Sequence, residues 1–337
     1  MATAPLVSVI IPNYNYARVL RQCLRAVQAQ TYQPIEIVLV DDCSTDDSVA
    51  VAESLGVRVI SPPSNGGVCA ARNLGVAHAR GEILFFLDSD VALDPGAVAK
   101  AVEVLRSGPR IGAVCGNYDT VPLTRDSLVK EYRNLFRHYW MKTNGENSVS
   151  GFLNCAIIAV PAAVWAEVGP WDPQLIHSEG LLVIERLTER YEVRLDSAIR
   201  GRHDDDATLG IALRKVFTRT HQHVPFFLQR RNVGGVVGSS ESGASLAAVL
   251  AVLTLPAALL SSIAWAAALP AAMVAACLAV DGRLYRFVFR TRGAAFWFFF
   301  FAVHFVVNLA IAAGAAAGIA HWLTSRSFRR LHGMATP

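Results

Sequence analysis

The chain has 337 residues, enough for one large domain and an appendage, and 53% of its residues are hydrophobic. Residues 1–240 hold 24 of the 31 Lys and Arg residues and 25 of the 27 Asp and Glu residues, so the remainder is basic and poor in charge. Acidic and basic residues nearly balance in residues 1–240, which argues against a nucleic-acid-binding protein. The apolar, basic remainder predicts a membrane protein. The six cysteines are scattered without a Cys-x-x-Cys pair, and we expect them to be reduced core thiols.

The first part alternates short apolar strands with amphipathic helices, which predicts a doubly wound α/β fold. The expected strands are residues 7–11, 35–40, 57–60, 83–87 and 111–116. The expected helices between them are residues 18–30, 46–55, 68–79 and 95–105. The pattern is then less regular, with helices at 128–142, from Pro161, at 179–191 and at 209–216, a strand at 152–160 and extended segments at 193–195 and 198–202.

Two later segments, residues 244–280 and 294–325, contain no Asp, Glu, Lys or Arg. As one helix, the first segment would be ~55 Å long, against a hydrocarbon core of ~30 Å. Pro256 and Pro270 offer breaks, so we expect two tightly joined crossings there and a third crossing in the second segment. Between the segments, Arg283, Arg286, Arg290 and Arg292 predict a basic loop on the cytoplasmic side.

The start of the chain does not resemble a signal peptide, because the apolar run Leu6–Ile11 is too short and lacks a basic segment before it. We therefore expect a multi-pass protein of the cell (inner) membrane whose first domain is cytoplasmic. The predicted domains are a first domain over residues 1–225, a linker or interfacial segment over 226–243, a membrane region over 244–325 and a basic tail over 326–337.

The triplet Asp88-Ser89-Asp90 directly follows the apolar run Ile83–Leu87, which is typical of a buried strand in a parallel sheet. Ligands of open α/β sheets bind where the strands end. Two carboxylates at such a place suit a hard divalent cation that also holds phosphate oxygens. The alternative is a pair of solvated aspartates in a turn, where Asp is common.

Five segments in this order resemble family 2 glycosyltransferases with the GT-A fold, and the resemblance covers about residues 6–220. The segments are Ser8–Asn15, Val40–Asp46, Asn65–Gly67, Ala71–Gly75 and Gly81–Asp90. The resemblance implies an α/β domain with a GT-A type doubly wound mixed sheet, followed here by transmembrane helices. It also implies transfer of a sugar from a nucleoside-diphosphate sugar.

The resemblance implies which residues bind the donor and the metal. The nucleotide sugar would be held by Pro12, Asn13, Asp41, Asp42, Arg72 and Asp88. Helix capping by one of the two adjacent aspartates, and a surface position for Arg72, are the alternatives. Mn²⁺ or Mg²⁺ would be held by Asp90, Asp88 and His203, because Arg200–His203 resembles the family's strand that ends in histidine. A surface histidine beside the acidic run 204–206 is the alternative.

The family's general base is commonly the aspartate of a Glu-Asp pair, and here that pair reads Glu179-Gly180. We predict that Glu179 takes the proton from the acceptor hydroxyl instead. Asp172 is another carboxylate that could serve. If Glu179 only caps its helix, catalysis is weak or lost.

The predicted function is that of a membrane-anchored inverting glycosyltransferase, with a UDP-sugar as the favoured donor and a lipid-linked or glycan acceptor. Gln229–Val233 does not match the Gln-x-x-Arg-Trp motif of processive members, so we expect one sugar per encounter. The alternative is a catalytically silent GT-A domain that binds nucleotide sugar as an assembly subunit. A transporter is disfavoured because the apolar segments carry no acidic residue.

Overall fold

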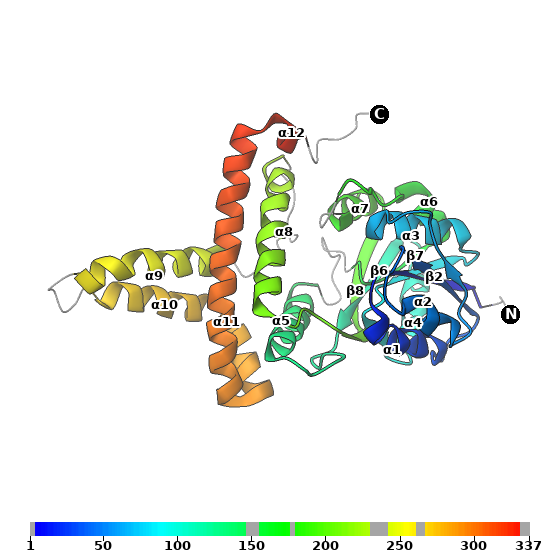
Figure 1. Ribbon diagram of the computed structural model, residues 1–337, viewed down its shortest axis with the longest axis horizontal. Coiled ribbons are helices and arrows are strands. Elements are labelled where there is room, and N and C mark those ends of the chain that lie inside the picture. Colours follow the sequence, from blue (N-terminus) through cyan, green and yellow to red (C-terminus); the bar gives the residue numbers. More distant parts are fainter. Residues whose placement is uncertain (1–3, 146–154, 176–178, 230–241, 261–266, 331–337) are drawn as a thin grey trace. The chain divides into compact units, whose positions relative to one another are not determined.

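The computed structural model describes residues 4–145, 155–175, 179–229, 242–260 and 267–330 (Figure 1). The chain forms two compact units. The first contains residues 1–126 and 140–205, and the second contains residues 127–139 and 206–337. The residues from 230 to 233, on which the prediction of one sugar per encounter depends, lie outside the described residues.

The first unit is built on a mixed sheet with the strand order β3-β2-β1-β4-β7-β6-β8-β5. Its strands are β1 Val7–Asn13, β2 Ile35–Asp41, β3 Val59–Ile60, β4 Ile83–Leu87, β5 Val91–Leu93, β6 Ile111–Tyr118, β7 Ile157–Pro161 and β8 Glu192–His203. The first four strands are parallel, whereas β7 is antiparallel to both β4 and β6. The carboxyl ends of β1, β2 and β4 therefore meet at one edge of the sheet.

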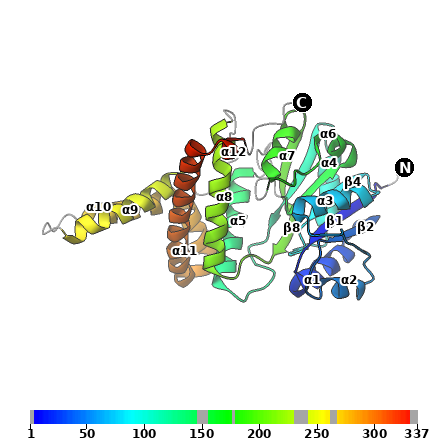
Figure 2. The same ribbon diagram turned by 45° about the horizontal axis from the view of Figure 1, so that its top comes forward.

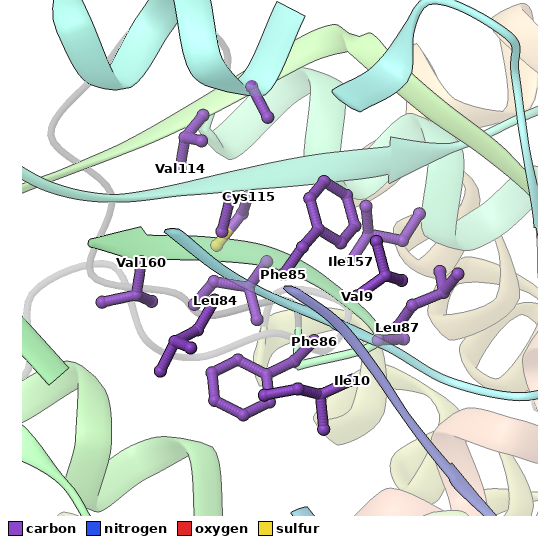
Figure 3. Packing of buried hydrophobic residues seen from close by; sticks show 14 of the residues in the cluster. Val9, Ile10, Leu84, Phe85, Phe86, Leu87, Val114, Cys115, Ile157 and Val160 are labelled. Carbon is purple, nitrogen blue, oxygen red and sulfur yellow. The ribbon is translucent and has the colours of Figure 1, made fainter. Parts of the chain in front are cut away.

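The central strands are apolar on both faces because helices cover them. Every residue of β4 is buried, and its side chains pack with those of β1, β6 and β7 in one continuous core (Figure 3). Burying a side chain of this size typically contributes about 1.5–3 kcal/mol, so this core holds the strand ends in place. The helices of this unit are α1 Ala17–Gln28, α2 Ser48–Glu53, α3 Gly67–His78, α4 Ala97–Arg106, α6 Ala162–Val168 and α7 Glu179–Thr188.

Helix α3 approaches the sheet closely at Gly75. A Cβ atom at this position would lie 2.4 Å from Cγ2 of Ile10 on β1, so any side chain here would force the helix or Ile10 to move. The close approach brings the preceding turn of α3 against the strands, and Arg72 on that turn is only 2% exposed. The sequence therefore places a buried arginine beneath the carboxyl end of β4.

Two features of the sheet differ from the sequence prediction. Strand β5 follows the acidic triplet immediately and was not expected. It pairs antiparallel with β8, which is one continuous strand where we predicted two extended segments. Cross-strand pairing, which the local pattern does not contain, stabilises both features.

The second unit is helical, and among the described residues it contains two segments that are long and apolar enough to cross a membrane, Gly243–Leu260 and Gly282–Thr324. Its helices are the start of α5 Leu128–Gly145, α8 Leu209–Gln229, α9 Ser242–Leu260, α10 Ala268–Val280, α11 Gly282–Thr324 and α12 Arg326–Arg329. Helices α9 and α10 lie side by side as a hairpin that projects from the pair formed by α8 and α11 (Figure 2). Helix α8 continues well beyond the predicted 209–216.

The predicted basic loop between the two apolar segments is wrong, because residues 282–292 are helical. The helix is interrupted at Gly293, whose φ of 79° and ψ of −178° lie outside the helical region and favour glycine. The 43 residues of α11 are thus two helices, 282–292 and 294–324, joined at this glycine.

Candidate active site

Polar side chains at the carboxyl ends of β1 and β2 form one hydrogen-bonded turn. The register pairs Asn13 with Asp41, and the Asn13 Nδ2 donates to Oδ1 of Asp41 at 2.8 Å. The Ser44 backbone N–H donates to the other carboxylate oxygen at 2.9 Å. Cys43 has a φ of 64°, so the chain turns sharply between the two partners. Asp41 thus closes this turn, and it does not cap the following helix, because α2 begins at Ser48 with Asp47 as its N-cap residue.

Asp42 holds the glycine loop that precedes α3. Its Oδ1 accepts the Gly66 N–H at 2.9 Å, and its Oδ2 accepts the Gly67 N–H at 2.8 Å. Gly67 has a φ of 80°, a conformation that a larger residue rarely adopts. Asp42 is 3% exposed, and each carboxylate oxygen retains a further lone pair. The carboxylate that the family resemblance assigns to the base is therefore fixed in orientation by two backbone donors.

Arg72 connects two of the predicted site carboxylates. Its Nη2 lies 2.7 Å from Oδ1 of Asp88, and its Nη1 lies 3.7 Å from Oε1 of Glu179. The guanidinium also lies 4.8 Å from the centre of the Trp171 ring. Burial raises the pKa of Asp88 and the charge of Asp90 adds to this, although Arg72 acts in the opposite direction. The surface position considered for Arg72 is wrong, because the side chain is buried between its partners.

Trp171 belongs to this cluster, although the sequence analysis did not single it out. It is fully buried, and the Asn73 side chain binds its backbone twice, donating to the carbonyl at 2.8 Å and accepting the N–H at 3.0 Å. The signal in the sequence was a tryptophan directly after Gly169-Pro170 in an otherwise polar turn. Asp172 accepts the Gln174 N–H at 2.9 Å and so stabilises the same turn. The neighbouring residues 176–178 lie outside the described residues.

Strand pairing brings Asp90 and His203 together. Val91 is the register partner of His203, and the Asp204 N–H donates to the Asp90 carbonyl at 2.9 Å. The Nε2 of His203 lies 3.4 Å from Oδ2 of Asp90, and its Nδ1 lies 3.6 Å from Oδ2 of Asp205. Burial would lower the pKa of His203, but the two carboxylates outweigh it and raise the pKa to about 9. His203 is 7% exposed, so it is not the surface histidine considered as the alternative.

The donor set around Asp90 fits a divalent cation. Oδ1 of Asp90 is buried without a hydrogen-bond partner in the described part of the chain. A carboxylate oxygen and an imidazole nitrogen are ligands that Mn²⁺ accepts, and a bound cation would displace the histidine proton. Among the described residues, no three His, Cys, Asp or Glu side chains already form a metal-binding group. The protein atoms present thus supply part of a coordination shell.

Comparison with known proteins supports the resemblance to family 2 glycosyltransferases. Residues 8–161 match the model of glycosyl transferase family 2. The chain is 28% identical over 195 residues to Glycosyltransferase AglE of Haloferax volcanii, covering 56% of this chain and 63% of that protein. It is 41% identical over 90 residues to Glycosyltransferase GlyG of Streptococcus pneumoniae, covering 25% of this chain and 30% of that protein. The chain thus matches less than two thirds of the length of each of these relatives.

The fold matches a solved structure, that of the mannosyltransferase PcManGT from Pyrobaculum calidifontis in complex with GDP-Man and Mn²⁺. The TM-score is 0.58 at 18% sequence identity, and the match covers 94% of this chain and 88% of that one. This likeness confirms the predicted mixed sheet of the GT-A type with apolar C-terminal helices. Residues 8–161 thus form a domain of the glycosyl transferase family 2 type, which confirms the resemblance found in the sequence.

Proposed function

We propose that the protein transfers a sugar from a nucleoside-diphosphate sugar to a lipid-linked or glycan acceptor, with inversion at the anomeric carbon and one sugar per encounter. The convergence of Arg72, Asp88 and Glu179 beneath the end of β4 carries the proposal. In this proposal, this cluster provides a carboxylate that acts on the acceptor. Asp42, whose carboxylate accepts the Gly66 and Gly67 N–H groups, lies at the same edge of the sheet and would contact the nucleotide.

Glu179 acts as the general base in this proposal. Its Oε2 is buried without a hydrogen-bond partner among the described residues, so one oxygen is available for an acceptor proton. The Arg72 Nη1 lies 3.7 Å from the other oxygen, and its positive charge would favour the ionised carboxylate. The acceptor oxygen would form a bond to the anomeric carbon, the bond to the diphosphate would break, and the nucleoside diphosphate would leave with the bonding electrons.

Pro12, Asn13, Asp41 and Asp42 form the nucleotide side of the site in this proposal, and Asp88 and Asp90 face the diphosphate. Asp90 and His203, with Asp88 beside them, would hold Mn²⁺ or Mg²⁺. The cation would neutralise charge on the leaving diphosphate. UDP-sugars are the donors we favour. GDP-mannose, the donor in the Pyrobaculum structure, is the next to test.

The apolar helices of the second unit would attach the protein to the cell (inner) membrane, with the catalytic domain on the cytoplasmic face. Two helices with the length and composition of membrane spans support this part of the proposal. Attachment would bring the donor site to a lipid head group, which is why a lipid-linked acceptor is proposed.

A panel of sugar nucleotides with Mn²⁺ and a polyprenyl phosphate acceptor tests the function, with release of nucleoside diphosphate as the measurement. We expect release with one class of donor, and its loss in the Asp90→Asn protein. Gly180 stands where the family has its catalytic aspartate, so binding of a nucleotide sugar without catalysis is the second candidate function. If calorimetry detects metal-dependent binding of a nucleotide sugar but no donor reacts, the protein is an assembly subunit. The absence of both binding and release would refute the proposal.

A further inference from the structure

The two helices of α11 fold back on each other at Gly293. Asp281, just before the first helix, has its Oδ2 3.1 Å from Nε2 of His304 on the second. Tyr285 on the first helix contacts the rings of Trp297 and Phe300 on the second, with centroids 6.0 and 6.2 Å apart. Residues 282–292 therefore lie antiparallel to the first turns of 294–324.

Apolar and basic side chains separate onto opposite faces of the helix 282–292. Leu284, Tyr285 and Val288 are buried in a cluster with Phe300 and other apolar residues of this unit. The three arginines that we call the arginine face are all exposed: Arg283, Arg286 and Arg290. Their spacing of three and then four residues places them along one side of a helix, opposite the buried side chains.

No acidic side chain of the described residues pairs with the arginine face. None of its members has an ion-pair partner among the described residues, whereas the next arginine, Arg292, lies 3.5 Å from Glu131. No Asp or Glu occurs anywhere in the sequence after residue 281. A concentrated positive surface thus remains open to an anionic partner.

The surroundings of this surface are apolar and exposed. Phe289 on the same helix is 53% exposed, and Phe298 just beyond the kink is 66% exposed. A helix with arginines on one face and large apolar groups around it is typical of the membrane interface. Exposed arginines are costly in hydrocarbon, so the helix belongs at the level of the head groups.

Helix α8 covers one side of the second half of α11. It packs closely along residues 294–324, because Cβ atoms at Gly314 and Gly318 would lie 2.6 Å from Phe217 and Val224 of α8. Helix α8 carries the exposed Arg214. Helix α8 therefore flanks the apolar helix 294–324, whereas the α9–α10 hairpin projects away from both (Figures 1 and 2).

We propose that the arginine face binds the anionic head groups of membrane phospholipids, with the helix 282–292 lying in the plane of the membrane surface. This inference rests on the proposed membrane attachment and not on the proposed chemistry. Because each arginine near an anionic surface strengthens binding, removal of three charges should weaken it by roughly 100-fold, and salt should weaken it further.

The test uses the full-length protein in neutral detergent micelles, titrated with phosphatidylglycerol or phosphatidylcholine that carries a small fraction of dansyl-labelled lipid. Energy transfer from tryptophan reports binding. We expect the wild type to prefer phosphatidylglycerol, and the triple variant R283Q/R286Q/R290Q to lose that preference. A matched control, R25Q/R58Q/R106Q, removes three exposed charges from the first unit and should bind as the wild type does.

Three results would overturn the proposal. The triple variant could retain the wild-type affinity for phosphatidylglycerol, or the wild type could bind both lipids equally. In a third arm, polyprenyl phosphate could compete far better than phosphatidylglycerol, which would make the surface an acceptor site. Nucleoside diphosphate release in the same micelles separates the two proposals: lipid preference without any transfer refutes only the proposed enzyme activity.

Discussion

The Nε2 of His203 lies 3.4 Å from Oδ2 of Asp90, although the two residues lie far apart in the sequence. The pairing of Val91 with His203 across β5 and β8 creates this contact. Oδ1 of the same aspartate is buried and without a hydrogen-bond partner among the described residues. The two side chains are thus held in place by backbone pairing and not by side-chain packing alone.

The Asp90→Asn substitution should remove metal-dependent activity. It keeps the shape of the side chain and removes the charge that a divalent cation requires. The loss of a metal contact typically costs several kcal/mol in the transition state, so turnover with Mn²⁺ should fall by at least about 100-fold. Asp94→Asn is the control, because Asp94 pairs with Arg200 at 2.8 Å away from the histidine. Unchanged affinity for Mn²⁺ and UDP, measured by calorimetry, would exclude Asp90 as a ligand.

The Glu179→Gln substitution should lower turnover by roughly 10²–10⁴-fold while leaving donor affinity nearly unchanged, because the amide has the same shape but cannot accept a proton. Glu189→Gln is the matched control, since it follows the same helix and is exposed. The measurement is the rate of sugar transfer at saturating donor. Wild-type turnover in the Glu179→Gln enzyme would assign the base to another carboxylate.

The Arg72→Lys substitution separates a positioning role from binding of the diphosphate. Lysine keeps the charge but is a compact point donor, so it should not hold Asp88 and Glu179 together. We expect turnover to fall by about 10–100-fold with little change in the KM for the donor. If Arg72 instead binds the diphosphate, the KM for the donor rises and turnover at saturation is preserved. Arg80→Lys, at an exposed ion pair with Glu36, controls for the loss of a guanidinium.

The Gly314→Ala substitution should destabilise the second unit. Alanine normally stabilises a helix relative to glycine by about 1 kcal/mol. Here the added Cβ would lie 2.6 Å from the Phe217 carbonyl oxygen, so α8 must move. We expect a net loss of about 1–3 kcal/mol, measured as a lower Tm in detergent. Gly210→Ala, where a Cβ meets nothing within 4 Å, is the control and should stabilise the protein. Equal effects of the two variants would contradict the packing of α8 on α11.

Local pattern determined much of the first unit. Short segments rich in apolar residues define β1, β2 and β4 in the sequence because buried parallel strands require them. The polar residues that follow these runs had to meet at one edge of the sheet, which placed Asn13, Asp42 and Asp88 in one region. The charge-free segments of the second unit could also be recognised in the sequence, because long helices without charged residues are typical of apolar surroundings.

Tertiary structure alone decided which side chains touch. Helical spacing could not distinguish a surface arginine from Arg72, which is buried because Gly75 lets α3 approach β1. Strand β5 and its pairing with β8 brought His203 to Asp90, a contact between segments whose local patterns are independent of each other. The fold at Gly293 turned an expected loop into a helix with an arginine face, because apolar contacts with residues 294–324 cover its other side. Such contacts depend on burial between distant segments, and the periodicity of a single segment does not contain them.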